Sequence, residues 1–140
     1  MQLDCEIPYE DMAYGMGTII VSPNYPNHYG NNMDCENMMK LSDTRVGILY
    51  FLSFHIDTAN YPSCAWDYLE VGSRIDTVQS TSKRLCGYTR PIPINLDGND
   101  FSLKFHSDAT NARLGFKIKI QEGKSQLIWQ TCFESQGRQV

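Results

Sequence analysis

Three aspartates with the chemistry to hold a metal ion lie far apart in this 140-residue chain. They are Asp57, Asp67 and Asp108, and each stands at the end of a strand-like run beside turn residues. If the fold brings these strand ends together, three carboxylates meet and repel one another unless a cation lies between them. Carboxylate, hydroxyl and amide oxygens are the ligands that calcium prefers. The pattern therefore predicts a calcium site. The alternative is that Asp67 caps a turn and Asp108 opens an Asx turn, with no ion.

The segments that must position these aspartates are short and apolar or alternating. The clearest ones span residues 17–21, 45–54, 66–71, 101–106 and 116–120. Alternation puts one side of a strand in the core and the other in water, and no long stretch repeats at the helical period. Many short strands separated by turn residues predict an all-β protein, an antiparallel β-sandwich.

Asp67 is expected on the buried side of its strand. Alternation along residues 66–71 places it on the same face as Leu69 and Val71, opposite Tyr68 and Glu70. A carboxylate on the core side requires compensation, and a bound cation would supply it.

The composition excludes some classes of partner. Hydrophobic content of 41% and charged content of 20% are ordinary for a soluble globular domain, and the length suits one domain. The net charge is −4 and the basic residues are scattered, which argues against a nucleic-acid partner. No apolar stretch is long enough to span a membrane. The first residues lack the features of a signal peptide, so a secreted form would be a mature chain or an excised domain with an added Met.

Five cysteines bear on the compartment: Cys5, Cys35, Cys64, Cys86 and Cys132. There is no Cys-x-x-Cys pair and no histidine at metal-ligand spacing, so zinc is not expected. Wide separation in a small, turn-rich chain predicts disulfides and an extracellular location, the alternative being buried thiols in a cytosolic protein. Four cysteines can pair in three ways. The fifth is then free, paired between chains, or bonded to a missing part of a parent protein.

Several segments together resemble a CUB domain. The opening runs from Cys5 through residues 17–29 to Cys35, and the likeness extends to about Ile120. The later matching segments are residues 51–57, 64–71, 85–87, 103–108 and 115–117. The resemblance implies an extracellular antiparallel β-sandwich with disulfides Cys5–Cys35 and Cys64–Cys86, which leaves Cys132 outside the pattern. It implies a CUB domain over residues 5–121. We expect an extension over residues 122–140 with one extra strand and a disordered end.

The resemblance also implies a calcium site at one end of the sandwich. Its acidic ligands would be the three aspartates, although Asp57 stands where the family usually has Glu, and the loop from Thr58 to Ser63 is longer than usual. The full implied set is Asp57, Asp67, Asp108, Thr110 and Asn111 as metal ligands, with Tyr29 as the residue that orients the first acid.

The predicted function is that of a non-catalytic, extracellular protein-binding module. No nucleophile motif surrounds the histidines, so the chain is not expected to be an enzyme. The family likeness implies calcium-dependent recognition of a Lys or Arg of a partner protein, with Asp57, Asp108 and an exposed Tyr61 in contact with it. The alternatives are a structural or dimerisation module, joined through Cys132, of a larger secreted or membrane-anchored protein, or a non-catalytic domain of a secreted protease.

Overall fold

The computed structural model describes residues 3–11, 17–40, 46–58, 64–75, 79–96 and 100–123. Ten strands occupy this part of the chain: β1 (Leu3–Cys5), β2 (Tyr9–Asp11), β3 (Thr18–Val21), β4 (Met33–Lys40), β5 (Val46–His55), β6 (Tyr68–Ile75), β7 (Gln79–Leu85), β8 (Ile94–Leu96), β9 (Asp100–His106) and β10 (Gly115–Gly123). No helix in these residues is long and apolar enough to cross a membrane.

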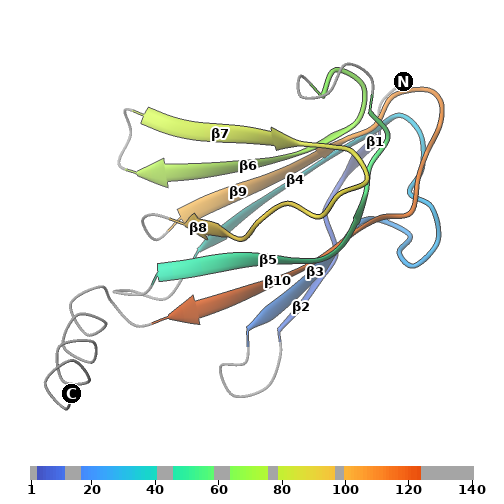
Figure 1. Cartoon of the computed structure of the whole chain (residues 1–140). Coiled ribbons are helices and arrows are strands. Elements are labelled where there is room, and N and C mark those ends of the chain that lie inside the picture. The colour runs from blue at the N-terminus through green and yellow to red at the C-terminus, as the bar shows by residue number, and fades with distance from the viewer. Residues whose placement is uncertain are drawn as a thin grey trace, which may run out of the picture.

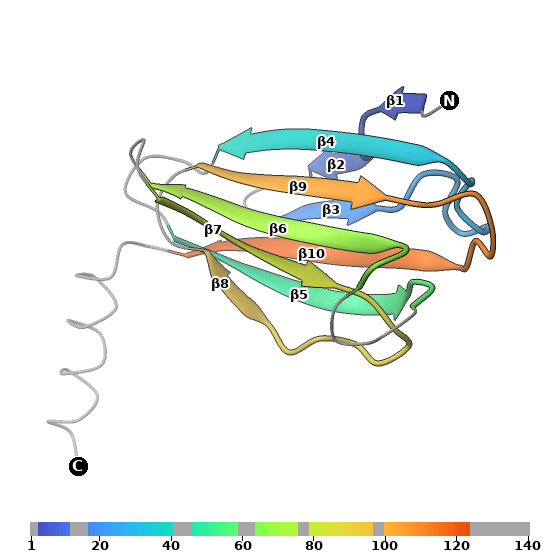
Figure 2. The same ribbon diagram turned by 90° about the horizontal axis from the view of Figure 1, so that it is seen from above.

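The strands form two five-stranded sheets that pack face to face (Figures 1 and 2). One sheet has the order β1-β4-β9-β6-β7 and the other the order β2-β3-β10-β5-β8. The predicted β-sandwich is confirmed. All neighbouring strands are antiparallel except β1 and β4, which pair in parallel.

The core lies between the sheets and follows the alternation of the strands. In β6, Leu69 and Val71 point inward, and Asp67 just before the strand is fully buried, as predicted. Tyr68 on the opposite face is also covered, because the His106 ring stacks on it at 5.1 Å and Arg84 lies over it at 4.0 Å.

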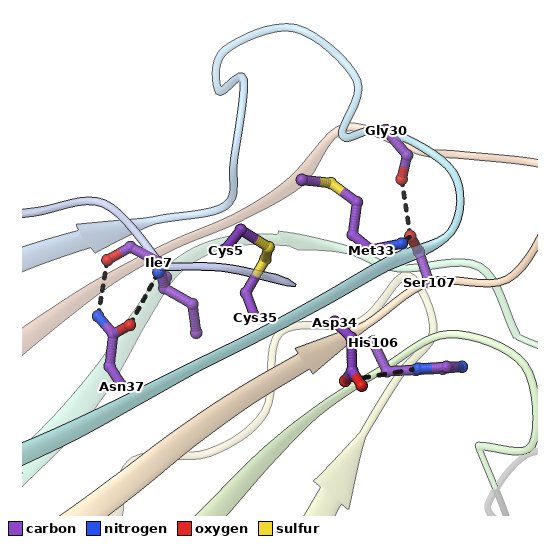
Figure 3. Close-up of a disulfide and its surroundings, with 9 residues drawn as sticks. All are labelled: Cys5, Ile7, Gly30, Met33, Asp34, Cys35, Asn37, His106 and Ser107. Carbon is purple, nitrogen blue, oxygen red and sulfur yellow. Dashed lines mark hydrogen bonds and ion pairs between the residues drawn. A yellow bond between two sulfur atoms is a disulfide. The ribbon is translucent and has the colours of Figure 1, made fainter. Parts of the chain in front are cut away.

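Both predicted disulfides, Cys5–Cys35 and Cys64–Cys86, are formed. Cys5 pairs in register with Cys35, so the first bond ties β1 to β4 (Figure 3). Beyond it, the Asn37 side chain exchanges two hydrogen bonds with the backbone of Ile7, at 2.8 and 2.7 Å. Each disulfide stabilises the fold by roughly 3–4 kcal/mol in the chain-entropy model. Cys132 lies outside the described residues.

The register of the sheets brings the loops of interest to one end of the sandwich. His55, the last residue of β5, pairs with Gly115, the first of β10. In the other sheet, His106 ends β9 beside Tyr68, which begins β6, and beside Asp34 near the start of β4. The loops that follow β5 and β9 therefore meet those that precede β4, β6 and β10, at the right-hand end in Figure 2.

Gly115 is required at this end, and replacing it with alanine should destabilise the protein by about 2 kcal/mol or more. Its φ is +92°, and an added Cβ would lie 1.9 Å from Ser22 Oγ, which accepts the Phe116 N–H. Chemical denaturation would measure the loss. Gly30→Ala is the control, because a Cβ there meets only the flexible Met33 side chain, at 3.3 Å. Equal stability of the two variants would contradict this account.

Candidate functional site

The hydroxyl of Tyr29 links two of the predicted acidic positions. It donates a hydrogen bond of 2.6 Å to Asp67 Oδ2 and accepts one of 3.0 Å from the backbone N–H of Asp57. The ring is buried between the sheets and packs edge-on against Phe105, with 4.8 Å between the ring centroids. Burial and the Asp67 carboxylate raise the pKa of Tyr29, so the phenol keeps its proton and acts as a donor at physiological pH.

Asp67 is the most deeply buried of the three aspartates. It is 0% exposed, and its second oxygen, Oδ1, accepts the backbone N–H of Asp108 at 2.8 Å. Burial raises the pKa of Asp67 from 3.8 to about 6, although its hydrogen bonds with Tyr29 and Asp108 favour the charged form. The carboxylate is still ionised at neutral pH. Because each carboxylate oxygen has two lone pairs, both can also face a cation.

The Asp108 loop is fixed by hydrogen bonds on both sides. The backbone carbonyl of Asp108 accepts the Asn32 N–H at 2.8 Å, and Asp108 Oδ1 accepts the Thr110 N–H at 3.2 Å. The second bond is the Asx turn that the sequence offered as an alternative to a metal site. It occupies one carboxylate oxygen. Thr110 and Asn111 are exposed, and Asn111 has a left-handed backbone with φ +63°.

Ser107 ties this loop to the segment that follows Tyr29 (Figure 3). Its hydroxyl donates to the carbonyl of Gly30 at 2.7 Å and accepts the Met33 N–H at 2.9 Å. Its own N–H bonds the Met33 carbonyl at 3.0 Å. These bonds therefore fix the position of Asp108 relative to Tyr29.

Asp57 is buried beside a cation, Arg113, that no sequence pattern identified as a site residue. Arg113 approaches its Oδ1 with Nε at 3.2 Å and Nη2 at 3.1 Å. The other oxygen, Oδ2, is buried and has no hydrogen-bond partner. The hydrogen bond from Arg113 Nε to Asp57 Oδ1 raises the pKa of Arg113. Asp57 is 2% exposed, so water cannot compensate the carboxylate, and only Oδ1 has a positively charged partner.

The structure thus brings most of the predicted positions into one network. Hydrogen bonds connect Asp57 to Asp67 through Tyr29, and Asp67 to Asp108. Within the described ranges, however, no three Asp, Glu, His or Cys side chains form a ready-made metal centre. Tyr61 falls outside those ranges. The donor set nevertheless fits calcium chemically, because it is made of oxygens and includes the buried, unpartnered Oδ2 of Asp57.

Comparison with known proteins identifies the family. The family model described as the CUB domain matches residues 10–120. The chain therefore belongs to the CUB domain family.

Relatives and solved structures agree with this assignment. Cubilin of Sus scrofa is 35% identical over 101 residues, which cover 72% of this chain and 3% of cubilin. The Tumor necrosis factor-inducible gene 6 protein of Homo sapiens is 38% identical over 119 residues, 82% of this chain and 42% of that protein. The fold matches a structure titled as the MASP-1 CUB2 domain bound to Ca2+, with a TM-score of 0.65 and 24% identity over 74% of this chain and 89% of that one. The chain spans only a small part of the first curated relatives that it matches.

Two predictions are confirmed at the level of the family. CUB domains are non-catalytic binding modules, and the relatives are secreted or extracellular proteins. The two disulfides are consistent with an oxidising compartment.

The pKa of Asp67 predicts how the stability of the calcium-free domain depends on pH. The folded state binds this proton more tightly than the unfolded state does. The free energy of unfolding should therefore fall as pH rises from about 4 to about 6, by roughly 1–3 kcal/mol. Other carboxyl groups titrate in the same range, so the measurement is the difference in urea denaturation between the wild type and Asp67→Asn. A difference that does not change with pH would refute the prediction.

Proposed function

We propose that this chain is a calcium-dependent protein-binding module that recognises a basic side chain of an extracellular partner. Asp57, Asp67 and Asp108 would hold the ion, with Thr110 and Asn111 as supporting oxygen donors and Tyr29 orienting the Asp67 carboxylate and the Asp57 backbone. When bound, calcium would neutralise carboxylates whose segments are otherwise joined through the Tyr29 hydroxyl and the backbone N–H groups of Asp57 and Asp108.

The observation that carries the proposal is Asp57 Oδ2. A buried carboxylate oxygen without a hydrogen bond is costly, and native structures seldom leave one unsatisfied without a reason such as an absent ion. Asp67, linked to Asp57 through Tyr29, is a second buried acid whose raised pKa reports incomplete compensation of its charge. The similar CUB2 domain of MASP-1 was crystallised bound to Ca2+, which further supports a calcium site in this chain.

The surface around the carboxylates favours a protein partner. Three large apolar side chains are exposed near them: Trp66 (45%), Tyr88 (59%) and Leu114 (47%). Trp66 precedes Asp67 in the chain and Leu114 follows Arg113, while the ring of Tyr88 contacts that of His55 at 4.5 Å. An acidic centre with aromatic and aliphatic neighbours suits a basic residue whose flanking side chains are apolar.

Calorimetric titration with calcium tests the metal arm of this proposal. The wild type should bind one ion, and Asp108→Asn should lower the affinity by at least about 100-fold, because it removes a full charge next to a divalent cation. Asp108 is suited to this test because it is only partly buried, so the variant should still fold.

The control for net charge is Glu36→Gln, which removes one negative charge from an exposed position in β4. It should bind calcium like the wild type. If the wild type takes up no calcium, or if both variants lose affinity equally, the proposed metal site is wrong.

A lysine analogue tests the partner arm. Nα-acetyl-lysine methylamide should bind the calcium-saturated domain with a dissociation constant on the order of 1 mM or weaker, as its size implies. Amide chemical shifts of residues 57 and 108 should move on titration. The corresponding norleucine compound, which lacks the ammonium group, should leave them unchanged, as should the lysine compound in excess chelator. Equal shifts with both compounds would contradict recognition of a basic group.

A further inference from the structure

The two oxygens of the Asp57 carboxylate have different surroundings because Arg113 pairs with only one of them. Oδ2 is buried and unpartnered, whereas Oδ1 receives both the Nε and the Nη2 of the guanidinium. The Arg113 side chain is 36% exposed, and the Asp57 side chain is 4% exposed. A side chain from another protein can therefore reach Asp57 only at Oδ1, the oxygen that Arg113 already covers.

The backbone fixes Arg113 in this place. Gly115, the first residue of β10, and His55, the last of β5, form the terminal pair of their ladder. Arg113 precedes Gly115 by two residues, and Asp57 follows His55 by two. The carbonyl of Arg113 also accepts the Tyr29 N–H at 3.0 Å. The ion pair therefore follows from the register of two central strands, and a freely moving surface arginine would not be held in this way.

The charges allow one monovalent cation at this site. With Asp57, Asp67 and Asp108 ionised, the carboxylates carry three negative charges, and one calcium ion leaves a single negative charge. One guanidinium or ammonium group neutralises it. Arg113 supplies that group from within the chain, at the same oxygen that a partner's basic side chain would use. A second cation at Oδ1 would be repelled by the first.

We propose that Arg113 is an internal competitor for the partner's basic side chain, so that binding exchanges one cation for another at Asp57 Oδ1. This inference rests on the proposed function. The cost of displacing Arg113 lowers the apparent affinity for every basic ligand, and so selects partners that also contact the exposed side chains Trp66, Tyr88 and Leu114. Displacement is feasible because the guanidinium is partly exposed and can be rehydrated.

The test compares the lysine analogue on calcium-saturated proteins, after the calcium affinity of each has been measured. Arg113→Gln should bind Nα-acetyl-lysine methylamide about tenfold more tightly than the wild type, within the usual range for a coupling between two sites. Arg113→Lys keeps the charge but loses the planar fork, and its affinity should lie between the two.

The matched control is Arg84→Gln. Arg84 also pairs with a carboxylate, Glu70, at 3.0 Å, so this variant removes the same charge and the same kind of contact on the face of β6 opposite to Asp67. It should bind the analogue like the wild type. A second readout is the Nε–H resonance of Arg113, identified by its loss in Arg113→Gln, which should shift towards the position of a solvated arginine as the analogue binds.

The outcomes separate this inference from the function on which it rests. If the wild type and Arg113→Gln bind the analogue equally, or if the variant binds less tightly, Arg113 is not a competitor although the domain still recognises a basic group. If neither protein binds it, recognition of a basic side chain is itself wrong. If only Arg113→Gln binds, competition is supported in its strongest form.

Discussion

The buried carboxylate of Asp67 is the constraint on which the loop end of this sandwich depends. A fully buried charge has to be compensated, and here the compensation comes from segments that are distant in sequence: the Tyr29 hydroxyl and the Asp108 backbone. The same Tyr29 hydroxyl also accepts a hydrogen bond from the backbone N–H of Asp57. One charge thus organises three loops. The pKa of Asp67 stays raised because two hydrogen bonds do not offset the loss of hydration.

The sheets make this arrangement possible because their register decides which loops meet. β5 and β9 end at the same end of the sandwich at which β4, β6 and β10 begin. Close backbone contacts then leave little freedom. Ser107 joins the end of β9 to the start of β4, and Gly115 lets β10 begin against Ser22 where any side chain would collide. The positions of the acids therefore follow from the core and the strand ladders.

The sequence predicts the parts of this design that have a local pattern. A nearly continuous apolar run identified most of β5, and alternation identified most of β9 and β10 and put Asp67 on the buried side. The same reasoning did not identify β4 and β7. Gln79–Leu85 is largely polar, Met33–Lys40 is half polar without strict alternation, and both owe their strand structure to neighbours in the sheet. The parallel pairing of β1 has no local signature either. Arg113 was missed for a related reason: an arginine in a loop is unremarkable until the β5–β10 register places it opposite Asp57.

The shorter acid at position 57 and the arginine at 113 are best understood together. The family resemblance implies Glu at position 57, and the shorter Asp keeps the carboxylate close to its own backbone, where one oxygen is buried. An internal cation is then the group best placed to reach the other oxygen, since the strand register already holds it there. If calcium and a basic group divide the two oxygens between them, Asp57 needs no longer side chain. Under the proposed function, the departure from the family pattern would change which basic group holds the carboxylate at rest and would leave the charge balance of the site intact.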